Sequence, residues 1–250
     1  MSIEIYGKGE RMRHLFRLCS GLYGSHLLLL PIPTTKDGEH LTGTDIRISD
    51  AISGVFSDSV AVCYGMPREY KEEILSRGAH LFDLSEDEKF LSENARLSAL
   101  GALGYILTEY GTDIKGARVG IVGYGRIGSR LLEMLLFLGA SVTLYSKRAE
   151  VRAELSLNGV ETSDAVYRGE VLCEELDLLI NTAPTDLSYL FEGGKIGEGL
   201  RVVELASGEN FGGIEGVVRL PGIPEKLYPE SSARLYRGAV SDYLLREGLL

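Results

Sequence analysis

The chain has 250 residues, of which 44% are hydrophobic and 25% are charged, and its formal net charge is −10 at pH 7. This length predicts about two domains, and the composition supplies enough apolar side chain for ordinary cores. The acidic balance excludes a broad basic face for nucleic acid, so a site for any anionic ligand must be built locally.

The cysteines and the apolar runs exclude further classes of protein. Cys19, Cys63 and Cys173 are far apart and show no C-x-x-C spacing, which indicates buried thiols in a reducing compartment and no zinc site. The longest apolar run, Leu27–Leu30, is far too short to span a bilayer, and the first residues lack the apolar core of a signal peptide. We therefore expect a cytoplasmic protein without a membrane, metal or nucleic-acid partner.

Residues 1–92 predict a small α/β domain, because short apolar runs alternate with apolar residues at helical spacing. The first run leads through Gly7-Lys8-Gly9 into a helical pattern. Two glycines suggest a second nucleotide site, but no third glycine closes the pattern, so none is predicted there. The expected strands are Ile3–Tyr6, His26–Ile32, Ser59–Cys63 and His80–Leu84; the expected helices follow Gly9, lie within Asp45–Phe56 and span Pro67–Ser76; Ser20–Ser25 is a glycine-rich turn.

A polar loop follows the most apolar strand of this domain. The strand reads HLLLLPI, which is typical of a strand buried on both faces of a parallel sheet, and it ends in Pro31–Gly38. Ligands of open α/β sheets bind at the carboxyl ends of strands, which makes Lys36 and Asp37 candidate site residues. A stiff, solvated loop is the alternative. Of the four histidines, only His40 lies near these residues in the sequence.

Two amphipathic stretches are expected to connect the domains. Glu86–Tyr110 has a helical pattern and leads into the linker Gly111–Lys115, and Ser232–Leu250 has a second such pattern. The chain is therefore predicted to be α/β with two domains: an N-terminal α/β domain of residues 1–92 with helix 232–250 packing back on it, a bridging segment 93–115, and a second domain with a parallel sheet at 116–231.

The second domain is organised around the sequence VGIVGYGRIG at Val119–Gly128. An apolar strand, a G-x-G-x-x-G turn and a helical pattern follow one another, as the dinucleotide fingerprint requires, so residues 116–231 are predicted to form an NAD(P)-binding Rossmann domain. Gly123 allows the tight turn, Gly125 lets the backbone approach a pyrophosphate, and Gly128 lets helix and strand pack closely. The positive end of the new helix then faces the phosphates. The fingerprint residues predicted to bind the cofactor are Gly123, Tyr124, Gly125, Arg126, Ile127 and Gly128.

The residues after the second strand of this domain decide which dinucleotide is expected. An NAD site usually has Asp or Glu there to hold the ribose 2′-hydroxyl, whereas this chain has Ser146-Lys147-Arg148. A hydroxyl and two cations suit a 2′-phosphate, so NADP is predicted. The alternative is that Lys147 and Arg148 only face solvent. An alternating β/α pattern continues to Leu220, with Ala165–Leu176 between two strands, and Asn181, Thr182, Ala183 and Pro184 end the fourth strand near the expected nicotinamide ribose.

Several blocks occur in one order and together resemble the A component of dipicolinate synthase, here called dipicolinate synthase A. They are HLLLLPIPTTKDG, the bridging segment with Asn94, DIKGARVGIVGYGRIG, INTAP at Ile180–Pro184, ELAS at Glu204–Ser207 and LPGIPEKLYP at Leu220–Pro229. The resemblance covers most of the chain. It implies an NADP-dependent two-domain oxidoreductase that works with a flavoprotein-like second component, dipicolinate synthase B, in the mother cell of sporulating bacteria. A homo-oligomer is also expected.

The reaction implied by the resemblance dehydrates and oxidises a cyclic product of lysine synthesis to pyridine-2,6-dicarboxylate. Such a flat dicarboxylate needs groups that hold anions. Lys36 and Arg126 are expected to line opposite walls of one cleft, Ser98 and Ser207 to donate hydrogen bonds, and Lys226 to close the site. Lys36, Asp37 and Ser98 are the catalytic candidates, although no general base stands out.

Two departures from the family pattern leave an alternative open. Leu97-Ser98-Ala99-Leu100-Gly101 has Leu100 where the family has a glutamate, and Gly208-Glu209-Asn210 replaces a cation, a proline and glycines. A non-catalytic NADP-binding sensor or scaffold protein is therefore the second hypothesis. A D-2-hydroxyacid dehydrogenase is rejected, because such enzymes need a histidine after the nucleotide domain's strands, and residues 81–250 contain none.

Overall fold

The computed structural model describes residues 2–19, 26–168, 176–191 and 195–250. The chain forms two compact units, Met1–Asn94 with Pro224–Leu250 and Ala95–Ile223, here called the first and second unit. It passes from one unit to the other within α4 (Glu88–Glu109) and within α7 (Ile223–Leu227). Both units contain a parallel sheet flanked by helices, which confirms the predicted α/β class.

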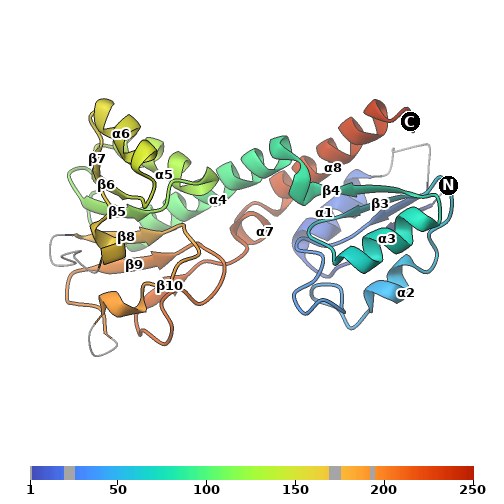
Figure 1. The fold of residues 1–250 in the computed structure, drawn as a ribbon, viewed down its shortest axis with the longest axis horizontal. Helices are drawn as coiled ribbons and strands as arrows, with labels where there is room; N and C mark the ends of the chain where they lie inside the picture. Colours follow the sequence, from blue (N-terminus) through green and yellow to red (C-terminus); the bar gives the residue numbers. More distant parts are fainter. Residues whose placement is uncertain (1, 20–25, 169–175, 192–194) are drawn as a thin grey trace. The chain divides into compact units, whose positions relative to one another are not determined.

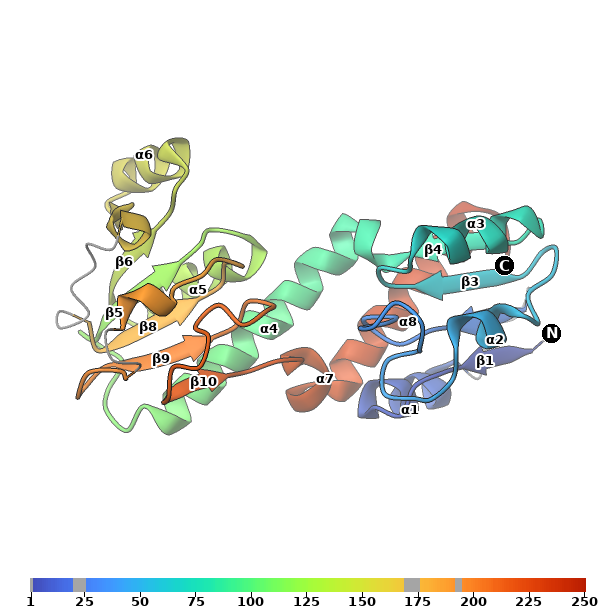
Figure 2. The same ribbon diagram turned by 60° about the horizontal axis from the view of Figure 1, so that its bottom comes forward.

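The first unit contains a four-stranded sheet in the order β1-β2-β3-β4, with all neighbours parallel (Figures 1 and 2). β2 is completely buried, as its apolar sequence predicts. It is shorter than the predicted strand, because Pro31 has no N–H with which to continue the ladder. The elements are β1 (Ile3–Ile5), α1 (Glu10–Leu18), β2 (Leu27–Leu29), α2 (Ile48–Ile52), β3 (Val60–Cys63), α3 (Arg68–Ser76), β4 (His80–Asp83), η1 (Leu84–Glu86) and α8 (Pro229–Arg246).

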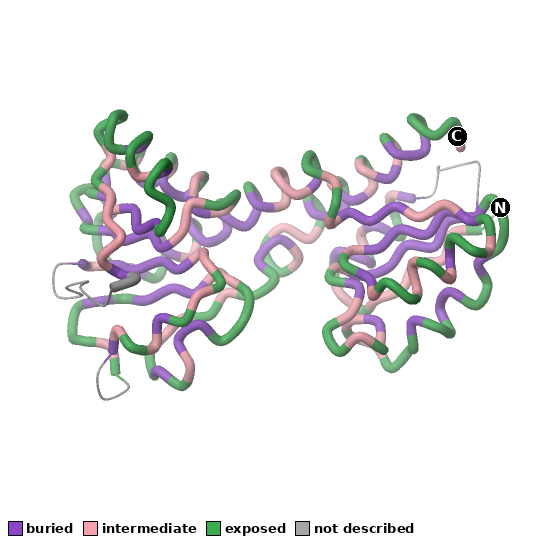
Figure 3. The backbone as a smooth tube through the Cα atoms, viewed as in Figure 1, coloured by how far each residue is buried: buried purple, intermediate pink, exposed green. Residues whose placement is uncertain are grey.

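Helices cover both faces of this sheet, so its two central strands, β2 and β3, are completely buried (Figure 3). α1 and α8 pack on the face formed by Leu27 and Leu29, and α2 and α3 pack on the opposite face. Tyr236 of α8 is completely buried, and its hydroxyl donates to the carbonyl of Leu30 at 3.0 Å. α8 begins at Pro229, earlier than the predicted helix, because proline suits the first turn of a helix.

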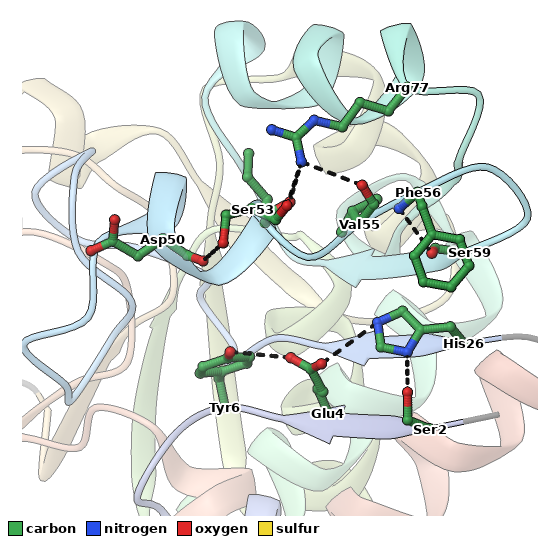
Figure 4. A network of polar contacts seen from close by, with 11 residues as sticks. Ser2, Glu4, Tyr6, His26, Asp50, Ser53, Val55, Phe56, Ser59 and Arg77 are labelled. Atoms are coloured by element: carbon green, nitrogen blue, oxygen red, sulfur yellow. Dashed lines mark hydrogen bonds and ion pairs between the residues drawn. The ribbon is translucent and has the colours of Figure 1, made fainter.

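A polar network ties the edge strand β1 to its neighbour (Figure 4). The imidazole of His26 lies 2.5 Å from the hydroxyl of Ser2 and 3.7 Å from the carboxylate of Glu4, which also accepts the hydroxyl of Tyr6 at 3.2 Å. The same ring stacks on Phe56 with 5.3 Å between centroids. His26 is therefore engaged in holding the edge of the sheet.

The second unit contains a six-stranded parallel sheet in the order β10-β9-β8-β5-β6-β7. Read from β7, the order is that of a doubly wound dinucleotide-binding fold, with its reversal between β5 and β8. The remaining elements are β5 (Arg118–Val122), α5 (Arg126–Phe137), β6 (Ser141–Tyr145), α6 (Ala149–Leu157), β7 (Glu161–Ser163), η2 (Ala165–Arg168), β8 (Leu178–Asn181), η4 (Ser188–Leu190), β9 (Arg201–Glu204) and β10 (Val217–Arg219).

The two faces of this sheet are covered differently. α4, α5 and α6 form one core with side chains such as Val119, Leu131 and Ile180, whereas the other face packs against loop residues such as Phe191 and Phe211. The predicted Ala165–Leu176 element begins as η2, and its residues 169–175, which include Cys173, lie outside the described part.

The unit boundaries differ from the predicted domain boundaries for reasons of packing. Most of the predicted bridging segment 93–115 belongs to the second unit, because Ala99, Leu103 and Ile106 are buried in its core. The second unit also ends at Ile223 and not at residue 231, since α7 from Pro224 onward belongs to the first unit. Ser20–Ser25, predicted as a turn, lies outside the described residues. In the described ranges, no helix combines the length and the apolar character needed to cross a membrane.

Candidate functional site

The three glycines of the turn between β5 and α5 differ in backbone conformation and in the space around them. Gly123 has φ = 95°, a left-handed conformation that side chains disfavour. Gly128 packs so closely that a Cβ atom there would lie 2.2 Å from the carbonyl oxygen of Gly123. In contrast, a Cβ atom on Gly125 would meet nothing within 4 Å. Two glycines therefore shape the turn, and Gly125 leaves its backbone open to approach.

A hollow of about 340 Å³ opens beside this turn, at the carboxyl ends of β5, β6 and β8. Ligands of doubly wound sheets bind at this edge, where the strand order reverses. Nine of its ten lining residues belong to the predicted cofactor set, and Thr185 is the addition that the sequence did not predict. The lining residues are Gly123, Tyr124, Gly125, Ser146, Lys147, Arg148, Thr182, Ala183, Pro184 and Thr185.

Four predicted cofactor residues do not line the hollow. Arg126 is exposed as the first residue of α5, and Ile127 is half-buried behind it. Gly128 is buried in the turn, and Asn181 is completely buried. Gly128 and Asn181 therefore support the walls of the hollow without facing it in this structure.

The segment after β6 forms a cationic rim that is held in place by hydrogen bonds. Ser146 is buried, and its hydroxyl accepts the N–H of Arg148 at 3.2 Å. The guanidinium of Arg148 donates to the carbonyl of Tyr124 at 2.6 Å, which connects the rim to the glycine turn. Arg152, which the sequence did not predict, donates to the carbonyl of Ser146 at 2.6 Å. A helical spacing of four residues from Arg148 was the available signal for it.

These features fit a dinucleotide. The N-cap of α5 is Gly125, whose lack of a side chain leaves the first N–H groups of the helix without a side-chain cap. Such N–H groups and the positive helix end bind phosphate oxygens. The hydroxyl and cations of Ser146, Lys147 and Arg148 stand where the adenosine ribose is expected. When bound, a nicotinamide dinucleotide supplies a hydride acceptor or donor.

A buried carboxylate lies next to this site, and nothing in the ELAS sequence that contains it predicts its burial. Glu204 ends β9 and is 3% exposed, and the amide of Asn181 donates to both of its oxygens at 3.1 and 3.3 Å. The N–H of Ala206 donates to the same carboxylate at 2.9 Å. Burial raises the pKa of Glu204, and these donors offset only part of that effect. The pair joins the turns after β8 and β9, which carry Thr182 and Ser207.

The first unit holds the other group of predicted residues in the loop after β2. Lys36 and Asp37 are exposed there, and the imidazole of His40 lies 3.0 Å from the carboxylate of Asp37. The N–H groups of His40 and Glu39 also donate to Asp37 and hold its pKa below its ordinary value. A carboxylate with a lowered pKa is a weak base at neutral pH, so this geometry gives Asp37 an orienting role.

The remaining candidates are distributed over the two units. Ser98 is buried within α4 of the second unit, and Ser207 is exposed after β9 of the same unit. Lys226 is exposed on α7 in the first unit. The expectation that Lys36 and Arg126 line one cleft stays a prediction, as do the substrate-binding roles of Ser98, Ser207 and Lys226.

One family model matches the part of the chain that contains most of this site. The family model "D-isomer specific 2-hydroxyacid dehydrogenase, NAD binding domain" matches residues 102–187, which include the glycine turn and the segment after β6. A search of curated protein sequences gives no match. This part of the second unit is therefore similar to the nicotinamide-dinucleotide-binding domain of dehydrogenases, as the fingerprint predicts.

Two solved structures match almost the whole chain, and a third matches most of it. Dipicolinate synthase A from Bacillus halodurans is 19% identical with a TM-score of 0.71, covering 97% of each chain. Dipicolinate synthase A from Bacillus subtilis is 17% identical with a TM-score of 0.72, covering 98% of this chain and 96% of that one. A transhydrogenase from Sinorhizobium meliloti is 19% identical with a TM-score of 0.57, covering 78% and 70%. The predicted resemblance to dipicolinate synthase A is thus confirmed as a likeness of fold.

Proposed function

We propose that this chain is an NADP-dependent oxidoreductase that converts a dihydrodipicolinate-type ring to pyridine-2,6-dicarboxylate. The observation that carries the proposal is the hollow beside Gly125, in which predicted cofactor residues from three strand ends come together. The fold in which it lies extends over nearly the full length of two dipicolinate synthase A structures. The oxidation aromatises the ring, so the protein mainly has to hold the ring and manage protons.

The choice of NADP rests on the cationic rim. Ser146, Lys147 and Arg148 line the hollow and include no carboxylate that would repel a 2′-phosphate. A charge-assisted contact to that phosphate contributes about 1.5–3 kcal/mol. NADPH is therefore expected to bind at least about ten times more tightly than NADH.

A fluorescence titration of NADPH and NADH against the whole chain tests this choice. Ser146→Asp is expected to reverse the preference, because the new carboxylate repels the 2′-phosphate and accepts a ribose hydroxyl instead. Lys195→Ala, outside the hollow, is the matched control and should leave both affinities unchanged. Equal affinities of the wild type for the two cofactors would contradict the proposal of NADP.

The substrate and partner belong to the same proposal. Lys36 is proposed to hold a carboxylate of the ring, and the flavoprotein-like dipicolinate synthase B is proposed as the partner in the mother cell of a sporulating bacterium. The direct test is formation of pyridine-2,6-dicarboxylate, followed by its ultraviolet absorbance, with the aldolase product, NADP⁺ and dipicolinate synthase B supplied. No product under these conditions would contradict the proposed reaction.

A non-catalytic NADP-binding protein is the second candidate. The observation that favours it is Leu100, which stands where the resembled family has a glutamate and is 37% exposed on α4. An apolar side chain at that position can neither transfer a proton nor hold a cationic or hydroxyl group of a ligand. Tight NADPH binding without turnover in the presence of dipicolinate synthase B would establish this alternative.

A further inference from the structure

A partly enclosed cavity of about 190 Å³ lies within the second unit, apart from the cofactor hollow. The last turns of α4 form one wall, and β9 and β10 form the other (Figure 2). Leu178 and Arg201, which begin β8 and β9, place the cavity toward the amino ends of these strands, whereas the cofactor hollow lies at the carboxyl ends. Among the described residues, none lines both spaces. The cavity is therefore separate from the cofactor site.

The connection from β9 to β10 explains why space remains beside α4. Residues 205–216, all of which the structure describes, contain no helix, although crossovers between parallel strands usually carry one. Phe211 of this connection is buried in the core on the opposite face of the sheet. The face of β10 next to α4 is therefore not covered by a helix from this connection. The floor of the cavity is apolar, because Ile106, Val203 and Val218 pack in the core on the α4 face.

The strand side of the cavity carries a cation. The guanidinium of Arg201 lies over the ring of Tyr110, with 5.1 Å from its carbon atom to the ring centroid. Tyr110 is 6% exposed, so its ring is a fixed support. In the part of the chain that the structure describes, no hydrogen bond or ion pair engages this guanidinium, and Arg201 is exposed. Its N–H donors can therefore bind a ligand carboxylate in the bidentate manner that suits a guanidinium.

The helix side of the cavity carries negative charge. Glu109 is the last residue of α4, is exposed and lines the cavity. Within the described ranges, no ion pair engages its carboxylate. The last turn of α4 has no basic residue, so nothing in that turn offsets the partial negative charge of the terminal carbonyl groups. A carboxylate and a helix C-terminus together attract a cation, and an ammonium group fits them.

We propose that this cavity binds a free α-amino acid with an apolar side chain. The side chain occupies the cavity, the carboxylate binds Arg201, and the ammonium group binds Glu109 and the end of α4. An apolar cavity of about 150 Å³ is large enough for benzene, so the cavity of about 190 Å³ accepts a phenyl or an isobutyl group. The inference goes beyond the proposed function, since it involves neither the dinucleotide nor the ring substrate.

Ligands with a single charge match the cavity less well. An apolar carboxylate binds Arg201 but brings its charge toward Glu109, and an apolar amine has the opposite disadvantage. The terminus of another chain also carries one of the two charges beside its last side chain, and not both. An α-amino acid carries both charges on one carbon atom, next to its side chain, and so complements the cation, the anion and the apolar floor together.

Binding of L-phenylalanine and L-leucine to the whole chain tests the proposal, by calorimetric titration and by nitrogen-15 NMR of the backbone. The signals of Glu109, Arg201 and Val218 should shift when either amino acid is added. N-acetyl-L-phenylalanine lacks the ammonium group, and L-phenylalaninamide lacks the carboxylate. Each analogue should bind at least about tenfold more weakly than L-phenylalanine, because each loses one charge-assisted contact. The two analogues also represent the C-terminus and the N-terminus of another chain.

Two variants remove the charged groups one at a time. Arg201→Gln and Glu109→Gln are each expected to weaken binding of L-phenylalanine about tenfold or more. The matched controls are Arg130→Gln and Glu133→Gln, which change an exposed pair on α5 that does not line the cavity. Both controls should bind L-phenylalanine as the wild type does. Val218→Phe, which fills the cavity from β10, should abolish binding, and its thermal midpoint and NADPH affinity show that it is folded.

Combining variants with analogues separates direct contacts from a general disturbance. Arg201→Gln should leave the affinity for L-phenylalaninamide unchanged, because this analogue has no carboxylate to bind. Glu109→Gln should not weaken binding of N-acetyl-L-phenylalanine, which has no ammonium group. A variant that only distorts the cavity would weaken all of these ligands alike, and that result would contradict the assigned contacts.

The remaining outcomes decide between the ligand classes. No binding of either amino acid to the wild type at about 10 mM overturns the proposal. Undiminished binding in both Arg201→Gln and Glu109→Gln places the ligand elsewhere and overturns it too. If N-acetyl-L-phenylalanine bound as tightly as L-phenylalanine, the terminus of another chain would replace the free amino acid as the ligand. NADPH titration of the same samples reports on the cofactor hollow independently, so each of these failures leaves the proposed function intact.

Discussion

The first strand of each unit leads through a glycine-containing turn into a helix, but the space next to the second glycine differs between the two turns. In the second unit, a Cβ atom on Gly125 would meet nothing within 4 Å. In the first unit, a Cβ atom on Gly9 would lie 1.5 Å from a carboxylate oxygen of Glu225, which belongs to the same unit. One turn is open to a ligand, and the other is filled by a carboxylate of the chain itself.

This difference shows what a glycine pair can and cannot predict. Both pairs remove side chains so that another group can approach the backbone. A dinucleotide site also needs a third glycine, here Gly128, so that the helix can pack closely on the turn, and it needs open space at the second glycine, here Gly125. Around Gly9, α7 supplies an anionic group in the place where a ligand phosphate would lie. Substitutions in each unit can therefore separate structural effects from effects on ligand binding.

The largest effect is expected from loosening the helix that completes the first unit. Tyr236 is completely buried between α8 and the sheet, so Tyr236→Ala leaves a cavity and two carbonyls without their donor. The free energy of unfolding of this unit should fall by about 3–5 kcal/mol. Tyr236→Phe, which removes only the hydroxyl, should cost about 1 kcal/mol.

Urea denaturation followed by circular dichroism measures both losses, and NADPH titration shows whether the damage is confined to the first unit. NADPH affinity should be unchanged in Tyr236→Phe. Equal losses of stability in the two variants would contradict the view that burial of the ring, more than its hydrogen bond, holds α8.

The second effect concerns the open turn. Gly125→Val should weaken NADPH binding at least about 100-fold, or about 3 kcal/mol, because the side chain occupies the approach to the pyrophosphate. The backbone at Gly125 has φ = −99°, which valine can adopt, so the thermal midpoint should change little. Gly9→Ala is the matched control in the first unit. It should disturb Glu225. NADPH affinity should stay within about threefold, which is well under 1.4 kcal/mol, because Gly9 does not line the hollow. Undiminished NADPH affinity in Gly125→Val would assign the fingerprint a structural role only.

Local sequence signals predict much of the difference between the two units. The features that they do not predict depend on contacts between residues far apart in the sequence. Most strands and the Rossmann fold of the second unit were predicted from apolar runs and glycine spacing, which are local signals, and nine of the residues predicted to bind the cofactor line the hollow. The contact of Glu225 with Gly9 and the pairing of Asn181 with Glu204 join residues far apart in sequence, so no spacing predicts them. The boundaries of the units also depend on which core buries Leu103 and Ile223, which only packing decides.

For other candidate residues, the sequence predicted the position in the chain but not the contacts of the side chain. Lys36 and Asp37 became candidates because their loop follows the end of a strand. The hydrogen bonds that make Asp37 an orienting group for His40 depend on the backbone of the loop, which no spacing specifies. Arg152 was not predicted as a site residue, because a basic residue on an amphipathic helix usually faces solvent.

The third effect concerns the loop of the first unit as an anion site. Lys36→Ala should weaken binding of pyridine-2,6-dicarboxylate by about 2 kcal/mol, the loss typical of a charge-assisted contact, and leave NADPH affinity nearly unchanged. Calorimetric titration of both ligands, with dipicolinate synthase B present, measures the two affinities. The neighbouring cation Lys8, in the filled turn, offers the control Lys8→Ala, for which neither affinity should change. An equal fall of both affinities in Lys36→Ala would mean that Lys36 is not a substrate anchor.

The smallest effects come from two buried carboxylates that end strands in the two units. Burial raises the pKa of Asp83 at the end of β4, but Lys71 and Ser85 outweigh it and lower the pKa to about 2. Burial raises the pKa of Glu204 at the end of β9. Asp83 therefore stabilises its unit above the ordinary pKa of aspartate, about 3.9, and this contribution is lost as the pH falls toward 2. It amounts to about 2 kcal/mol at neutral pH.

The contribution of Glu204 to stability changes with pH in the opposite direction, because the folded chain binds the proton of Glu204 more tightly than the unfolded chain does. Its contribution is fully present below the ordinary pKa of glutamate, about 4.3, and is lost as the pH rises through the raised value. Thermal midpoints between pH 3 and 7 test this with Asp83→Asn and Glu204→Gln. The advantage of the wild type over Asp83→Asn should grow as the pH rises from 3, whereas its advantage over Glu204→Gln should shrink above about pH 4.3. A hydrogen bond lost in either amide variant shifts its difference in thermal midpoint from the wild type by the same amount at every pH. If these two differences changed with pH in the same direction, the pairing of Asp83 with Lys71 or the burial of Glu204 would be contradicted.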